Sequence, residues 1–182
     1  MKLPRPRIQP VQKNELTTEQ RELLDPLGQA GRLNVFMTLI RHPKLFQRFL
    51  PFAEHIHTST LPSRDREILI LRTAWLCQAE YEWAHHAISG KQAGLTDQEI
   101  LRIPKGPNAE GWSSFDATLL QAVDELHKDA FISDSTWVAL AEQYTEQQLM
   151  DLVFTVGTYN LASMALNSFV VQLDEGVTGF RK

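Results

Sequence analysis

The sequence SRDREILILRTAWL, residues 63–76, decides the fold. Its run from Ile68 to Leu71, followed by Ala74, Trp75 and Leu76, is apolar on nearly every side of a helix. A helix that is apolar all round lies in the interior, surrounded by other elements. We therefore predict a central helix that begins within residues 61–67, with Ser63 as its N-cap, and continues through the apolar run to Leu76.

A second helix is predicted to follow at once, over about residues 79–93. Gly94 comes directly after it, and glycine is the usual residue just beyond a helix C-terminus. The turn between the two helices is short, so we expect them to form a central antiparallel pair.

The rest of the chain also shows helical patterns. Pro51 lies inside one of them and is expected to kink or split it. No alternating strand or Asn-Gly hairpin is evident, and the β-branched run near residues 169–171 is the one place where a strand could form. The sequence therefore predicts an all-α fold, whose further helices are expected over about residues 17–27, 35–41, 43–57, 96–103, 113–130, 133–144 and 145–171.

The composition is that of an ordinary globular protein. The 182 residues are 43% hydrophobic and 22% charged, with a net charge of −4. Lysine and arginine are scattered, so we expect no nucleic-acid partner. We also expect no signal peptide and no membrane span, because no apolar stretch comes near the ~18 residues that a span requires. The single cysteine, Cys77, cannot form an intrachain disulfide, which favours a reducing, cytoplasmic location.

Candidate chemistry is concentrated between Glu67 and His86. Glu82 and His86 are four residues apart and share a helix face. Glu67 lies on the preceding helix, which is otherwise too apolar to face water, and the antiparallel pair can bring it against that face. A buried carboxylate beside an imidazole is a plausible proton relay, since burial raises the pKa of the acid and the carboxylate orients the histidine.

A ferritin-like di-metal site is the alternative that a Glu-x-x-His pattern raises. The segments at Glu82 to His85 and Asp124 to His127 resemble such motifs, but the site requires further carboxylates on long helices. The predicted helices are short and interrupted by proline, so we expect neither a metal nor a cofactor. His55 and His57 are interpreted as surface residues, and Cys77 as a small buried hydrophobic residue.

An ordered set of residues resembles the carboxymuconolactone decarboxylase family, which includes the AhpD-like alkylhydroperoxidases. The resemblance is dense over residues 60–103, and it is carried by residues 64–72, Tyr81-Glu82-Trp83, His86 and residues 94–100. It implies an AhpD-like bundle of about seven to nine helices. It further implies one domain over residues 1–182, in which an N-terminal arm and helices (1–58) precede the core motif (59–104) and the C-terminal helices (113–172).

The resemblance also bears on the chemistry. The peroxidase branch of the family uses a glutamate, a Cys-x-x-Cys pair and a histidine. Aligning these on Glu67 and His86 places the two cysteines at Ala79 and Glu82, and neither is cysteine here. A thiol peroxidase needs an attacking thiolate and a group to resolve the sulfenic acid. The segment is therefore interpreted as an acid/base site, similar to the decarboxylase side of the family.

The resulting hypothesis is an enzyme that decarboxylates or isomerises a small lactone or enolisable acid. His86 is the acid/base, Glu82 its partner, and Glu67 a second proton carrier. Arg72 or Arg64 neutralises a substrate carboxylate, and Tyr81 and Trp83 line the substrate site. Two alternatives stay open: an AhpD-like hydroperoxidase and a non-catalytic, oligomeric ligand-binding protein. The resemblance implies a homo-oligomer, as a trimer or hexamer.

Overall fold

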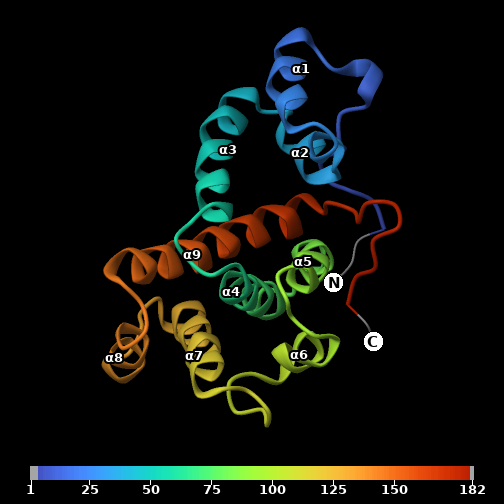
Figure 1. The fold of residues 1–182 in the computed structure, drawn as a ribbon. Coiled ribbons are helices and arrows are strands. Elements are labelled where there is room, and N and C mark those ends of the chain that lie inside the picture. Colours follow the sequence, from blue (N-terminus) through green and yellow to red (C-terminus); the bar gives the residue numbers. More distant parts are fainter. Residues whose placement is uncertain (1–3, 181–182) are drawn as a thin grey trace.

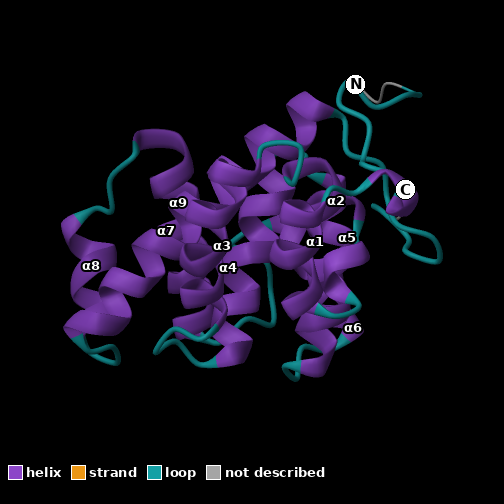
Figure 2. Ribbon diagram, turned by 90° about the horizontal axis from the view of Figure 1, so that it is seen from above, coloured by secondary structure: helices purple, strands orange, loops and turns teal. Residues whose placement is uncertain are grey.

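The computed structural model describes residues 4–180. Helices and loops make up this part of the chain, which has no strand (Figure 2). The α-helices, with short 3-10 helices between some of them, are α1 (Thr18–Leu24), α2 (Asn34–Leu39), α3 (Pro43–His57), α4 (Ser63–Leu76), α5 (Glu80–Gln92), α6 (Asp97–Arg102), α7 (Ser114–Asp129), α8 (Asp134–Ala141) and α9 (Glu146–Phe169). The predicted all-α fold is confirmed.

Helix α4 is the centre of the molecule, as its sequence predicts. Every residue from Glu67 to Ala74 is buried. α4 packs against α5, α7 and α9, and its apolar side chains join theirs in the main hydrophobic core. In Figure 1, α9 crosses the picture with α1 to α3 above it and α4 to α7 below it.

A second, smaller core holds the N-terminal helices together. Phe46 of α3 lies in it with Leu24 of α1 and Met37 of α2. Between the two cores, Ile56, Ile70 and Tyr159 form a small cluster that joins α3 to α4 and α9. The C-terminal end of α3 is thereby fixed beside the central helices, where it borders the candidate site.

One local prediction was wrong, and two points that the sequence left open are defined by the structure. Ser63 is the first residue of α4, and Pro62 is the N-cap, with extended backbone angles (φ −52°, ψ 135°). Of the two outcomes expected at Pro51, a kink or a split, the split does not occur, because the loss of one hydrogen bond is offset by the buried residues Phe46 and Ile56 on either side of it. The run after Phe169 is no strand, since Val170 ends α9 in the left-handed conformation (φ +58°).

The length of α9 corrects another expectation. By length and composition alone, α9 could cross a membrane, contrary to the prediction that no apolar stretch is long enough. Half of the relevant 18-residue window is buried inside the protein, which is also what a core helix shows.

Candidate functional site

A histidine between two carboxylates forms the centre of the candidate site. His86 Nδ1 lies 2.8 Å from Glu67 Oε2, and His86 Nε2 lies 3.6 Å from Glu82 Oε2. The first distance is a hydrogen bond and the second is an ion-pair contact beyond hydrogen-bond length. All three residues are buried, with exposed fractions of 3% for Glu67, 9% for Glu82 and 7% for His86. The structure thus brings together the three residues predicted to act in catalysis.

The helices explain this convergence. Glu82 and His86 are one turn apart on α5, and Glu67 lies on α4, which packs along α5. Gly90 of α5 permits the close approach, because a Cβ there would meet the side chains of Leu95 at 3.0 Å and Leu71 at 3.3 Å. The antiparallel pair thus positions an acid and a base that lie 19 residues apart.

Burial and neighbouring charge set the proton affinities of the site. Burial raises the pKa of Glu82, and the charge of Glu67 raises it further, although His86 opposes both. Burial alone would lower the pKa of His86, but the hydrogen bond and charge of Glu67, together with the charge of Glu82, outweigh it and raise that pKa. The imidazole therefore holds a proton more firmly than an ordinary histidine does.

Two further side chains border His86. The Tyr159 ring meets the His86 ring edge-on at 4.9 Å, and its hydroxyl lies 3.4 Å from His57 Nε2. The ring of His57 is parallel to that of His86, with centroids 6.1 Å apart. His57 is exposed, as predicted, whereas Tyr159 is buried, so His57 lies between the buried cluster and solvent. Partial burial of the ring lowers the pKa of His57, and the charge of His86 lowers it further.

The predicted substrate-binding arginines have other partners. Arg64 donates to both oxygens of Asp116 and to Glu99, which ties α4 to α7 and α6. Arg72 donates to both oxygens of Asp124, at 2.6 and 2.8 Å, and to the carbonyl oxygens of Ile103 and Pro104. These guanidinium groups are engaged by internal acceptors, so their contacts in this structure do not support the assignment to a substrate carboxylate.

Arg66 is the cation that the sequence reasoning missed. It precedes Glu67 on α4, and its charge acts on His57, His86 and Tyr159. Its buried Nε has no hydrogen-bond partner, and within residues 4–180 its guanidinium forms no ion pair. A buried unpaired donor costs free energy of about 1–3 kcal/mol, so it calls for an explanation. The sequence does not show that Arg66 differs from Arg64 and Arg72, because the acids that bind Arg64 and Arg72 lie far along the chain.

The other two predicted substrate-binding residues, Tyr81 and Trp83, contact groups other than His86. Tyr81 donates its hydroxyl to Asp174, which also contacts His85 Nε2 at 2.9 Å and accepts from the backbone N–H of Asn34. Trp83 packs in the main core against Trp75 and Phe180. The position of Trp83 in the core lends no support to its predicted role in the substrate site. Tyr81 anchors the C-terminal segment and lines a pocket elsewhere.

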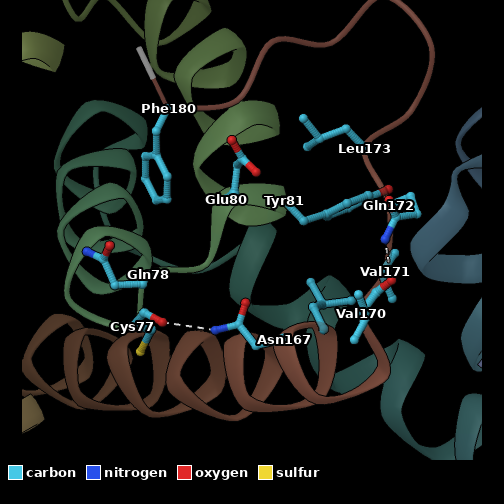
Figure 3. Close-up of a pocket in the computed structure, with 11 residues that line it drawn as sticks. Cys77, Gln78, Glu80, Tyr81, Asn167, Val170, Val171, Gln172, Leu173 and Phe180 are labelled. Atoms are coloured by element: carbon cyan, nitrogen blue, oxygen red, sulfur yellow. Dashed lines mark hydrogen bonds between the residues drawn. The ribbon is translucent and has the colours of Figure 1, made fainter. Parts of the chain in front are cut away.

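That pocket, shown in Figure 3, has a volume of about 680 Å³. It lies where the turn before α5 meets the end of α9, and its walls include Glu80, Tyr81, Asn167, Leu173 and Phe180. A second pocket of about 620 Å³ lies around Arg102 on α6. Neither pocket is lined by Glu67, Glu82 or His86.

Cys77 contributes its backbone, rather than its thiol, to the 680 Å³ pocket. In Figure 3 its carbonyl accepts a hydrogen bond from Asn167 Nδ2 (2.9 Å), while the sulfur points toward α9. The Sγ lies 3.2 Å from Asn160 Oδ1 and 3.8 Å from His127 Nδ1. Burial raises the pKa of this thiol, which disfavours the reactive thiolate. Cys77 is half-buried and has polar neighbours, so the interpretation as a buried hydrophobic residue was only partly right.

Solved structures with the same arrangement of helices define the class of fold. An uncharacterized peroxidase-related protein with an alkylhydroperoxidase AhpD core, from Ralstonia eutropha JMP134, superposes with a TM-score of 0.82 at 16% identity, covering 95% of this chain and 94% of that one. A peroxidase-related protein from Silicibacter sp. TM1040 gives 0.76 at 12% identity, with coverages of 88% and 87%. The debrominase Bmp8, in complex with 2,3,4-tribromopyrrole, gives 0.75 at 12% identity, with coverages of 92% and 91%. The fold is therefore AhpD-like.

A family model matches part of the sequence. Residues 43–107 match the carboxymuconolactone decarboxylase family, and this range contains Glu67, Glu82 and His86. The chain thus combines an AhpD-like fold with a segment, residues 43–107, that is similar to the carboxymuconolactone decarboxylase family. A comparison with curated protein sequences finds no match.

Proposed function

We propose that this protein is an enzyme that performs acid/base chemistry on a small organic acid or lactone, by decarboxylation or isomerisation. The observation that carries the proposal is the buried His86 held between Glu67 and Glu82. Two carboxylates on one imidazole, shielded from water, form a site in which protons can be stored and moved.

The two ring nitrogens have different tasks. A carboxylate can only accept a hydrogen bond, so the contact with Glu67 keeps a proton on Nδ1 and fixes the orientation of the ring. Nε2 is then the atom that gives and takes the working proton, with Glu82 as its partner. In a decarboxylation, the bond to the carboxylate carbon breaks, carbon dioxide leaves, and the electron pair stays as an enolate. Nε2–H then protonates the enolate carbon.

Arg66 is the group we assign to the substrate carboxylate. Its positive charge acts to lower the pKa values of His57, His86 and Tyr159, and within the described residues its guanidinium forms no ion pair with an acid. A carboxylate that forms a charge-assisted hydrogen bond to the buried Nε would satisfy that donor. This replaces the assignment to Arg64 or Arg72.

A thiol-dependent hydroperoxidase has less support. Ala79 and Glu82 occupy the positions at which the resemblance places redox cysteines, and Cys77 is the only cysteine. Peroxide turnover should be absent, or equal in the wild type and in Cys77→Ser. A rate that depends on Cys77 would favour the hydroperoxidase over the acid/base enzyme.

A non-catalytic ligand-binding protein is the second candidate. It is favoured by the position of the 680 Å³ pocket, which lies outside the Glu67–Glu82–His86 cluster. If that pocket is the only binding site, a ligand should bind equally well to the wild type and to His86→Gln, and Arg66→Met should have no effect.

The test is a panel of small lactone acids and β-keto acids in deuterated water. Carbon dioxide release and deuterium incorporation next to the carbonyl are followed by NMR. His86→Gln should lower either rate by about 10²–10⁴-fold, and Glu82→Gln should also lower it. His85→Gln is the matched control, because the neighbouring histidine contacts Asp174 instead. Equal rates in His86→Gln and wild type would contradict the proposal.

A further inference from the structure

Helix α9 carries an apolar stripe that the protein leaves uncovered. Its four large side chains are between 51% and 63% exposed. The spacing of four, three, four and three residues places them, with an exposed glycine, on one face of the helix. The stripe consists of Met150, Phe154, Gly157, Leu161 and Met164.

The stripe is nearly symmetric about Gly157. A methionine lies seven residues away on each side, and a large apolar residue lies three residues before it and four after it. A Cβ built on Gly157 would meet nothing within 4 Å, so no packing within this chain requires glycine there. Glycine in the middle of a helix is also unfavourable by itself. A small residue at this place does, however, let a second backbone approach closely.

Charge and area fit an interface. No Asp, Glu, Lys or Arg occurs between Leu152 and Phe169, so two such faces would not repel each other. Phe52 of α3, 39% exposed, extends the stripe by packing edge-on against Phe154. A large apolar side chain that is half exposed offers on the order of 100 Å². Phe52 and the four large side chains of the stripe therefore offer roughly 500 Å², about two-thirds of the ~800 Å² that each partner buries in a standard interface, before the flanking residues are counted.

We propose that this stripe binds a second copy of the same chain across a two-fold axis at Gly157. In this arrangement α9 crosses α9 of the partner subunit in antiparallel fashion, with the two glycines at the crossing point. A two-fold contact uses the same patch on both copies, so a patch that is symmetric about one residue suits it. The resulting unit is a dimer. A hexamer can be built from such dimers through one further kind of contact, whereas a trimer without a two-fold axis cannot contain this interface.

The first experiment measures the mass of the full chain by sedimentation. The wild type should sediment as a multiple of two chains. Leu161→Glu should weaken the dimer by at least 100-fold in dissociation constant. Leu101→Glu is the matched control, because Leu101 is 54% exposed on α6, as against 56% for Leu161. A wild-type monomer, or equal loss of association in both variants, would overturn the proposal.

The second experiment tests the axis. Gly157→Leu should fold with an unchanged or higher Tm, because the site is open and glycine disfavours helix, yet it should weaken the dimer. In a Cys77→Ser background, Gly157→Cys should form an interchain disulfide on mild oxidation, and Leu101→Cys should not. An unchanged mass for Gly157→Leu would overturn the proposal. So would a monomer that floats with phosphatidylcholine vesicles, since the stripe would then be a lipid-binding surface.

Discussion

Arg72 and His86 are each 7% exposed on neighbouring helices, but their partners differ in kind. Arg72 distributes its donors between Asp124 and two backbone carbonyls, so its charge is fixed and fully matched. His86 has one nitrogen in a hydrogen bond to Glu67 and the other 3.6 Å from Glu82. One buried cation is part of the framework, and the other can change its charge.

The difference shows why burial alone does not identify a functional residue. An arginine stays protonated at all physiological pH values, so a saturated Arg–Asp pair can only hold elements together. An imidazole between two carboxylates can exchange a proton with either one. The comparison predicts that changes around Arg72 act on stability, whereas changes around His86 act on proton affinity.

The largest expected effect on stability is that of Arg72→Met. It leaves the carboxylate of Asp124 and two carbonyls without their donor, which should lower the free energy of unfolding by about 3 kcal/mol. Urea denaturation measures this. The double variant Arg72→Met/Asp124→Leu should recover part of the loss. A loss below about 1 kcal/mol in the single variant would show that this pair does not hold the helices together.

An intermediate, pH-dependent effect is expected for Glu67→Gln. The folded-state pKa of His86 is raised above 6.5, largely by Glu67, so this interaction adds stability that is fully present below pH 6.5. The stability is lost as the pH rises through the raised pKa. The wild type should therefore exceed Glu67→Gln by about 1.5 kcal/mol near pH 6, and the difference should shrink toward pH 9. A difference that grows with pH would mean that the sign of the coupling is wrong.

The smallest effect on stability is expected for Arg66→Met. The variant removes a buried donor that has no partner and breaks no ion pair among residues 4–180, so the free energy of unfolding should not fall and should rise by about 1 kcal/mol. Binding of a carboxylate substrate should nevertheless weaken. Urea denaturation set beside the Arg72→Met curve separates the two arginines. A loss as large as that of Arg72→Met would show that Arg66 is structural.

The sequence was sufficient where the pattern is local. The all-round apolar run predicts the central position of α4, and the four-residue spacing of Glu82 and His86 predicts their shared face. Placing Glu67 against that face required only that two consecutive helices pair. These inferences depend on helix periodicity and on one short turn, both of which the sequence shows directly.

The sequence was insufficient where partners lie far apart. Arg64 and Arg72 bind acids that are 52 residues further along the chain, on α7, and nothing near either arginine indicates this. His57 and Tyr159 meet although they are 102 residues apart. Which arginine is left unpaired, and which histidine borders the site, are decided by tertiary packing.

The most direct test of the central claim is an NMR titration of the His86 imidazole in the wild type and in Glu67→Gln. We predict a pKa above 6.5 in the wild type and a lower pKa in the variant, with the proton held on Nδ1 in the neutral form. A wild-type pKa at or below 6.5 that Glu67→Gln leaves unchanged would contradict the account, because His86 would then be an ordinary buried histidine.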